Sequence, residues 1–134
     1  MKVRCSPDGA EQTVIAHDLL KGTLRVGVGR SSLDPEVVYW FRAVMGFEMS
    51  PQAELTEPRV EAQEAPFALA PGERLNLHIF LDRSVLEVFA NGRQCLLQRI
   101  YPSRSDSLDV RVFSRGGGMT VRSIAAWDMA ATNG

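Results

Sequence analysis

The sequence predicts an all-β domain, a two-sheet antiparallel β-sandwich of the jelly-roll or concanavalin-like kind with about eight or nine strands. Three observations predict it. Apolar and polar residues alternate along several short segments. Turn-forming residues separate these segments. No amphipathic helical pattern of useful length occurs. The spacing of short strands between turns is typical of a sandwich or a barrel.

Residues 75–101 are predicted to form three consecutive antiparallel strands. In residues 75–81 leucine and isoleucine alternate with polar or aromatic residues, and a tight reversal follows at residues 82–84. A second β-rich run ends at Asn91-Gly92, the strongest short hairpin signal in the chain because both residue types tolerate positive φ. We expect this meander to form the centre of the sandwich, with the other strands added around it.

The other predicted strands have the same alternation, interrupted by turns such as Ser6-Pro7-Asp8-Gly9. The run from Ser107 to Ser114 alternates strictly, and Trp127 at the end of the last strand is predicted to be a core residue. The residues from 37 to 49 are apolar at nearly every position, so periodicity does not separate strand from helix there. The predicted strands lie at residues 1–5, 12–18, 23–28, 59–65 (an edge strand), 107–114 and 119–127.

The chain has 134 residues, so we expect residues 1–134 to form a single domain. A net charge of −1 gives no electrostatic case for binding nucleic acid or an anionic membrane. No apolar run approaches the roughly 20 residues that span a bilayer. The first 20 residues lack the pattern of a signal peptide, and the compartment stays unknown.

The chain has two cysteines, Cys5 and Cys95, and each lies in a predicted strand. They permit a disulfide in an oxidising compartment, but two buried free thiols are the favoured interpretation, because a domain of this size folds without a disulfide cross-link. Neither cysteine forms a CxxC motif, and His17 and His78 are not at metal-ligand spacing to them. We therefore predict no metal and no cofactor.

Hydrolysis of a glycosidic bond needs two carboxylates about 5–9 Å apart. Asp82 and Glu87 lie across one reversal and are the pair most able to meet, with Asp106 and Asp109 as further candidates. Carboxylates in turns usually accept backbone N–H groups, and a strand glutamate near arginines is usually an ion-pair partner. A structural role is therefore favoured for both. No nucleophile elbow, HExxH motif or phosphate-binding glycine loop occurs.

Four large aromatic residues gather within nine positions of the ambiguous segment: Tyr39, Trp40, Phe41 and Phe47. Three interpretations stay open for them. They are core residues, a face buried by a partner domain, or a platform on which sugar rings stack.

The order of several motifs resembles the C-terminal β-sandwich of glycoside hydrolase family 32, which contains the invertases, levanases, inulinases and other β-fructosidases. The central stretch, residues 80–92, is similar to the family's signature of aspartate-x-serine, then glutamate-valine-phenylalanine, then asparagine. The resemblance covers nearly the whole chain. The other matching segments are Cys5-Ser6-Pro7-Asp8-Gly9, Glu11-Gln12-Thr13, Arg30-Ser31-Ser32-Leu33, Gln98-Arg99-Ile100-Tyr101-Pro102 and Trp127.

The resemblance implies that the chemistry resides in an N-terminal five-bladed β-propeller, which would be the partner of this chain. The family's nucleophile, acid/base and sugar-holding motifs are absent here. Leu33-Asp34-Pro35 lacks the arginine of an arginine-aspartate-proline motif, and Gln94 rather than glutamate precedes Cys95. No catalytic residue is carried over. The resemblance implies instead fold-determining roles in and beside the tight turns for Asp82, Ser84, Glu87, Asn91 and Gly92.

The chain is thus expected to be a non-catalytic module that stabilises a β-fructosidase propeller. One outer surface would pack on the propeller, with residues 37–49 as a hypothesised component, and an uncovered apolar surface would favour a homo-oligomer. Two alternatives remain. One is a free-standing carbohydrate-binding module for fructose-containing saccharides. The other is an enzyme in its own right, dependent on Asp82 or Glu87.

Overall fold

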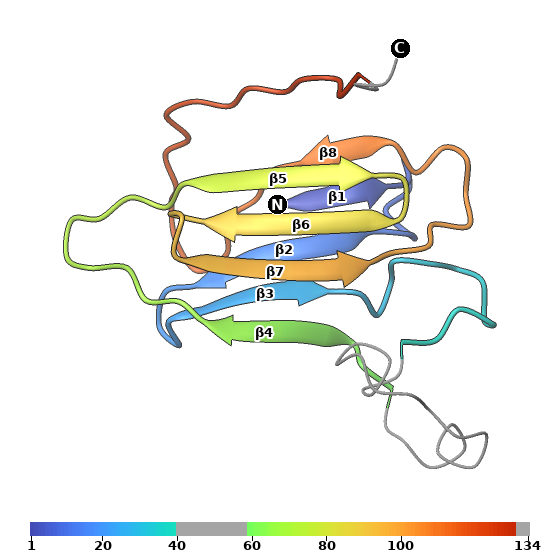
Figure 1. Ribbon diagram of the computed structural model, residues 1–134, viewed down its shortest axis with the longest axis horizontal. Coiled ribbons are helices and arrows are strands. Elements are labelled where there is room, and N and C mark those ends of the chain that lie inside the picture. The colour runs from blue at the N-terminus through green and yellow to red at the C-terminus, as the bar shows by residue number, and fades with distance from the viewer. Residues whose placement is uncertain (40–58, 131–134) are drawn as a thin grey trace.

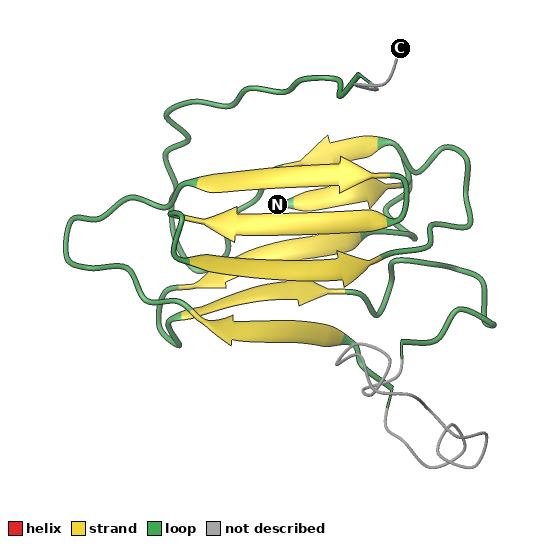
Figure 2. Cartoon of the chain, in the orientation of Figure 1, coloured by secondary structure: helices red, strands yellow, loops and turns green. Residues whose placement is uncertain are grey.

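The computed structural model describes residues 1–39 and 59–130. It shows two stacked β-sheets, and the described residues contain no helix (Figure 1, Figure 2). Every strand pair is antiparallel, which confirms the predicted fold class. The strands are β1 (Lys2–Cys5), β2 (Thr13–Asp18), β3 (Thr23–Gly27), β4 (Ala62–Pro66), β5 (Leu77–Asp82), β6 (Val85–Ala90), β7 (Gln94–Arg99) and β8 (Asp109–Arg111).

The larger sheet has five strands in the order β4-β3-β2-β1-β8. Strands β2 and β3 form a hairpin over five residue pairs, and its turn contains Gly22 at a φ of 61°. That positive φ suits glycine, which has no Cβ to clash. Strand β4 lies at the edge of this sheet, as the sequence predicted for residues 59–65.

The smaller sheet is the predicted meander, with the order β5-β6-β7. Two tight turns with positive φ join its strands. The first contains Arg83 at 51°, and the second contains Asn91 at 49° and Gly92 at 64°. Positive φ at both residues is what a type I′ turn requires, and the Arg93 N–H donates to the Ala90 carbonyl across the turn at 3.0 Å. Among the described residues the meander is a complete sheet, and the other five strands form the sheet opposite it (Figure 1).

The core lies between the two sheets and is built from alternate residues of each strand. Ile15, Leu24 and Val26 of the larger sheet and Leu86 and Val88 of the smaller one are at most 1% exposed. Each such side chain contributes about 1.5–3 kcal/mol by leaving water. Because the period is two, burying these residues places their neighbours on the outer faces of the sheets.

The C-terminal part of the chain differs from the prediction. Residues 119–127 form no strand, and Trp127, predicted to be a core residue, is 82% exposed. The predicted strand at 107–114 is reduced to β8, and the alternating Leu108, Val110 and Val112 are exposed rather than buried. Figure 1 shows the chain after β8 running away from the sandwich. Alternation in the sequence was not enough for residues 119–127, because no strand of the described part of the chain pairs with them.

The two cysteines are free. Cys5 is buried in the core, but Cys95 is exposed on β7, so the prediction of two buried thiols is wrong for Cys95. The inward residues of β7 are Leu96 and Gln98, which leaves Cys95 on the outer face. The sandwich therefore separates the two thiols.

Candidate interaction site on the outer face of the three-stranded sheet

The outer face of the β5-β6-β7 sheet carries three large apolar side chains, Phe80, Phe89 and Leu97, around the central Glu87. Residues directly opposite each other in an antiparallel sheet share a face. Phe80 of β5 lies opposite Glu87 of β6, which lies opposite Leu97 of β7. Phe80 is 44% exposed and Leu97 is 56% exposed. The next row consists of His78, Phe89 and Cys95. We call these six residues the outer apolar face.

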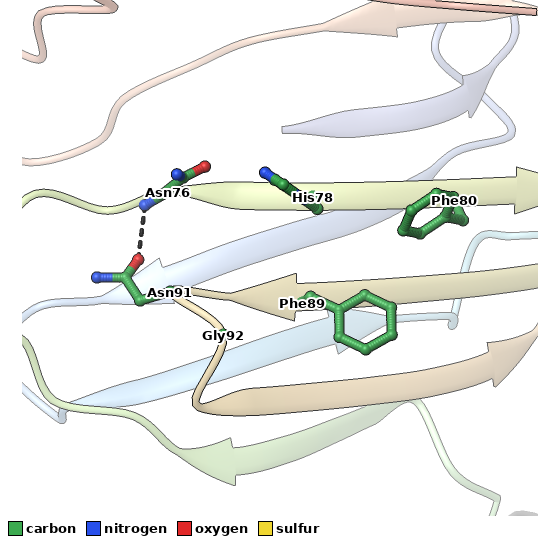
Figure 3. Close-up of a pocket in the computed structure, with 6 residues that line it drawn as sticks. All are labelled: Asn76, His78, Phe80, Phe89, Asn91 and Gly92. Carbon is green, nitrogen blue, oxygen red and sulfur yellow. Dashed lines mark hydrogen bonds between the residues drawn. The ribbon is translucent and has the colours of Figure 1, made fainter.

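A pocket of about 360 Å³ lies at the Asn91-Gly92 end of this face. Figure 3 shows Phe80 and Phe89 along one part of it and the hairpin turn at the other. The two phenyl rings meet edge to face, with centroids 5.9 Å apart. Aromatic pairs prefer this arrangement. The lining residues are Asn76, His78, Phe80, Phe89, Asn91 and Gly92.

Asn91 uses its side chain within the protein. Its Oδ1 accepts a hydrogen bond of 2.7 Å from the backbone N–H of Asn76, drawn in Figure 3. Its Nδ2 donates to Glu73 at 2.7 Å and to the carbonyl of Arg74 at 2.9 Å. These bonds tie the hairpin turn to the chain that enters β5. The Asn91 amide is thereby occupied by bonds within the fold.

Glu73 completes this small network. Its carboxylate accepts a bond from the backbone of Ala70 at 2.8 Å and pairs with Arg93 at 2.6 Å. The hydrogen bond from Ala70, followed by that from Asn91, lowers the pKa of Glu73 below its ordinary value. The network anchors the pocket's end of the meander.

The structure separates the two candidate carboxylates from the pocket. Asp82 lies at the end of β5 opposite Val85, and Glu87 lies in the centre of the outer apolar face. Neither residue lines the pocket. Ser84 lies in the β5–β6 turn, and its carbonyl accepts a hydrogen bond of 2.8 Å from Ile100. The roles assigned to these three residues by resemblance stay predictions.

Of the four aromatic candidates, Tyr39 alone is within the described residues, and Trp40, Phe41 and Phe47 lie outside them. Tyr39 is half-buried and packs against the core. Its ring stacks on Tyr101 at 6.3 Å, and its hydroxyl accepts a bond from the Tyr101 N–H. Burial raises the pKa of Tyr39. Tyr39 is therefore not part of the outer apolar face.

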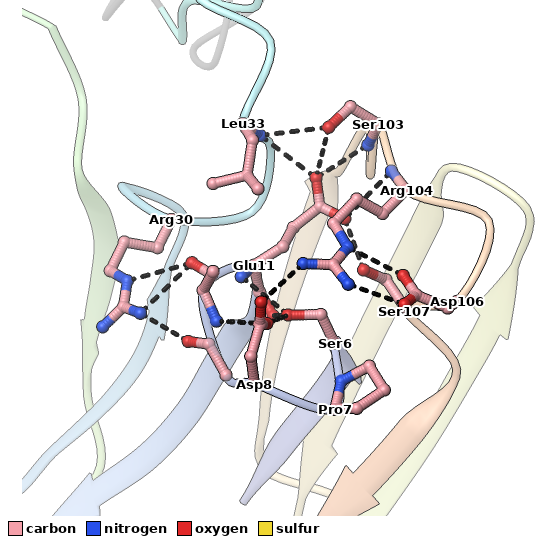
Figure 4. Close-up of polar contacts among 12 residues, drawn as sticks. Ser6, Pro7, Asp8, Glu11, Arg30, Leu33, Ser103, Arg104, Asp106 and Ser107 are labelled. Atoms are coloured by element: carbon pink, nitrogen blue, oxygen red, sulfur yellow. Dashed lines mark hydrogen bonds and ion pairs between the residues drawn. The ribbon is translucent and has the colours of Figure 1, made fainter.

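A second polar site, which sequence reasoning missed, is centred on Glu11 (Figure 4). This glutamate is 0% exposed. Its carboxylate accepts bonds from the backbone N–H groups of Leu33, Ser103 and Arg104 at 3.1, 2.7 and 3.2 Å. It also accepts hydrogen bonds from the hydroxyls of Ser103 and Ser107. Glu11 thus connects the start of β2 to two loops distant in the sequence.

The electrostatics of Glu11 favour its charged form. Burial by itself raises the pKa of the carboxyl, but the bonds from Ser107, Ser103 and Arg104 outweigh it, so the pKa lies below its usual range. At the rim, Arg104 pairs with Asp8 at 2.7 Å and with Asp106 at 2.6 Å. The polar groups of this cluster bond to one another, so the cluster holds the loops together.

Within residues 1–39 and 59–130, no group of three or more His, Cys, Asp or Glu side chains is placed to hold a metal ion. In the same part of the chain no helix is long and apolar enough to cross a membrane.

The fold defines the class of protein, a two-sheet antiparallel β-sandwich domain. Residues 1–128 match the family model described as "Glycosyl hydrolases family 32 C terminal". The chain belongs to this family, which confirms the resemblance found in the sequence.

Similar proteins are enzymes much longer than this chain. It is 37% identical over 60 residues to a cell-wall β-fructofuranosidase of Zea mays and 33% identical over 72 residues to a 6(G)-fructosyltransferase of Asparagus officinalis. These matches cover 42% and 50% of this chain but only 10% and 12% of the relatives. The crystal structure of exo-inulinase from Aspergillus awamori matches 80% of this chain and 17% of its own, with 23% identity and a TM-score of 0.57. That likeness shows the shared fold.

Proposed function

We propose that this chain is the non-catalytic C-terminal module of a β-fructofuranosidase-type glycoside hydrolase and that it stabilises a catalytic propeller domain. The family match over residues 1–128 carries the proposal. The catalytic motifs of family 32 are absent from the sequence. The matched regions are a small share of each relative, in keeping with one module of a larger enzyme that cleaves sucrose or fructans.

The physical role of such a module follows from burial. A sandwich that covers apolar surface on a neighbouring domain raises that domain's stability by roughly 25 cal/mol for each Å² removed from water. Interfaces between domains of one chain commonly bury about 600–1,500 Å². The module would thus raise the temperature at which the propeller loses activity, without touching substrate.

A chimeric enzyme tests the proposal. The C-terminal module of the Aspergillus awamori exo-inulinase is replaced by this chain, and fructose release from inulin is followed after heating. We expect the chimera to be active and to lose activity at a higher temperature than the same enzyme without any module. A chimera as labile as the enzyme without a module, or an inactive one, would contradict the proposal.

The purified chain alone tests the other two functions. We expect no fructose release from sucrose by the isolated chain, and release abolished by Asp82→Asn or Glu87→Gln would instead make it an enzyme. A carbohydrate-binding module would use the aromatic pocket that Asn76 and His78 line. Calorimetric titration with sucrose, inulin and levan tests it, and millimolar or tighter binding would support this second candidate.

A homo-oligomer through an exposed apolar face is a further part of the proposal, and light scattering over a range of chain concentrations measures it. Association that rises with concentration would support it, and a constant monomer mass would exclude it.

A further inference from the structure

We propose that the outer apolar face of the β5-β6-β7 sheet is the surface on which the catalytic domain packs, and that its pocket receives one apolar side chain of that domain. The inference rests on the proposed function and adds to it the surface of contact and the chemistry of the partner. It requires a partner surface with a projecting aliphatic or aromatic side chain and, close by, a cationic or N–H donor.

The two outer faces of the sandwich differ in character. The face of β5-β6-β7 exposes Phe80 and Leu97 beside Phe89. In the five-stranded sheet, strands β1 to β4 expose no large apolar side chain, and Val110 of β8 is the one that is exposed. This sheet carries an ion pair of 3.4 Å between Arg25 and Glu64, both about half exposed. Contiguous apolar surface marks interaction sites, so the smaller sheet is the face suited to a partner.

The pocket's chemistry favours a side chain over a sugar. A sugar ring needs several hydrogen bonds to its hydroxyls, because each hydroxyl that leaves water unpaired costs free energy. The Asn91 amide is already bonded to Asn76, Glu73 and Arg74. The surface left for a ligand consists of the rings of Phe80 and Phe89 together with the side chains of Asn76 and His78 (Figure 3). Pockets of this kind take up anchoring side chains at the centre of protein interfaces.

Glu87 determines which polar groups the partner surface must place against this face. It is half-buried between Phe80 and Leu97 and forms no ion pair within the described residues. Burial, followed by the charge of the neighbouring Glu87, raises the pKa of the Cys95 thiol. A domain that covers the face has to supply a lysine, an arginine or backbone N–H groups opposite Glu87.

The relatives are much longer than the part of them that matches this chain. The matched part of the exo-inulinase is 17% of that chain, and the matched parts of the plant relatives are 10% and 12%. In such enzymes most of the chain lies outside the module and is covalently linked to it. A linked domain has an effective concentration of about millimolar, so it occupies the face ahead of a second copy or a free saccharide.

Cys95 supplies a native probe, because its exposed thiol lies on this face opposite Phe89 while Cys5 is buried in the core. The chimera described above and the isolated chain are treated with N-ethylmaleimide at one pH, and labelling of each cysteine is followed by mass spectrometry. We expect Cys95 to react at least about tenfold more slowly in the chimera. Cys5 is the internal reference for folding and stays unlabelled in both.

Variants connect this protection to the face. Leu97→Asp and Glu87→Lys are expected to return the Cys95 rate in the chimera to within about twofold of the isolated chain and to abolish the module's thermal benefit. Leu20→Asp is the matched control, because Leu20 is 99% exposed in the β2–β3 turn, away from this face. Its chimera should behave as the parent chimera does. Circular dichroism melts of the isolated variants confirm that each one folds.

The outcomes separate the two proposals. An active, stabilised chimera in which Cys95 reacts at the free rate would overturn this inference and leave the proposed function standing. A chimera without activity or thermal benefit would overturn the proposed function itself. Protection of Cys95 in the chimera that appears only at high protein concentration, or only on adding inulin, would identify a second copy or a saccharide as the occupant and would also overturn the inference.

Discussion

At the scale of single residues, Glu11 has the largest set of polar contacts in the described structure, and the fold depends on its charge. Its two carboxylate oxygens face three backbone N–H groups and two serine hydroxyls. Replacing Glu11 by glutamine puts an amide N–H₂ against those donors. We expect Glu11→Gln to lower the free energy of unfolding by about 2–3 kcal/mol and Glu11→Ala by about 3–5 kcal/mol, measured by urea denaturation.

The matched control is Glu64→Gln, which removes a carboxylate from an exposed pair with Arg25. Exposed pairs contribute at most about 1 kcal/mol, so this variant should change the free energy of unfolding little. Equal losses for Glu11→Gln and Glu64→Gln would show that the buried cluster is not the stabilising element described here.

The sequence allowed the Asn91-Gly92 turn to be predicted but not the Glu11 cluster. The physical reason is the difference in sequence separation between the interacting residues. A type I′ turn is decided by the φ preferences of two adjacent residues. The partners of Glu11 are Leu33 and residues 103–107, up to 96 positions away. The available signal was a glutamate entering a strand and a serine-rich loop elsewhere. Pairing them requires the three-dimensional fold.

At the scale of elements, the segment after β8 is the part of the described chain least attached to the sandwich. Residues 119–130 form no strand, and their apolar side chains, Trp127 among them, are exposed. An extended segment without a hydrogen-bonded ladder is readily accommodated by a protease. We expect brief trypsin treatment of the native chain to cut at Arg115 and Arg122 before Arg25, Arg99 or Arg111, which lie in strands, as read by mass spectrometry of the fragments.

Protection of Arg122 for as long as Arg99 would contradict this description and would place the segment in a sheet. The comparison is internal to one digest, so the amount of protease does not affect it. The exposure of Arg115 beside the Gly116–Gly118 turn offers a second cut in the same segment.

The meander and the C-terminal segment explain how much of the fold was predictable. Both alternate in the sequence, but residues 75–101 carry two turns that bring each strand against the next one. Local signals therefore specified the pairing as well as the strands. Residues 119–127 follow a run of three glycines, and no turn motif in the sequence indicates which strand they would pair with. Alternation shows that a segment is able to form a strand, and pairing decides whether it does.

The interaction site was predictable only in part, for the same reason. The sequence predicted that Glu87, Asn91 and Gly92 would lie in and beside the central hairpins. It did not show that Phe80, Phe89 and Leu97 meet on one outer face, because that follows from the register across three strands. Of the aromatic residues proposed as a cluster at positions 39–47, the structure describes Tyr39 alone.

At the scale of the whole molecule, the resolved shifts of carboxyl pKa all point the same way. Hydrogen bonds from Ser6 lower the pKa of Asp8, those from Arg104 lower the pKa of Asp106, and the pKa values of Glu11 and Glu73 are lowered as described above. Backbone bonds from Lys21 similarly lower the pKa of Asp18. A carboxyl whose folded pKa is below its unfolded value binds fewer protons when folded. Folding is therefore favoured above the unfolded value and opposed as pH falls.

This sign predicts an acid-labile module. Unfolded aspartate and glutamate titrate near pH 4, so stability from these groups is fully present above about pH 5 and is lost as pH falls through the folded pKa values. We expect the urea midpoint to be nearly constant from pH 7 to 5 and to fall steadily from pH 4.5 to 2.5. Glu11→Gln should fall less steeply, because its buried carboxyl no longer titrates. A midpoint that rises on acidification, or a Glu11→Gln slope equal to that of the unmodified chain, would contradict the assignment of acid sensitivity to this cluster.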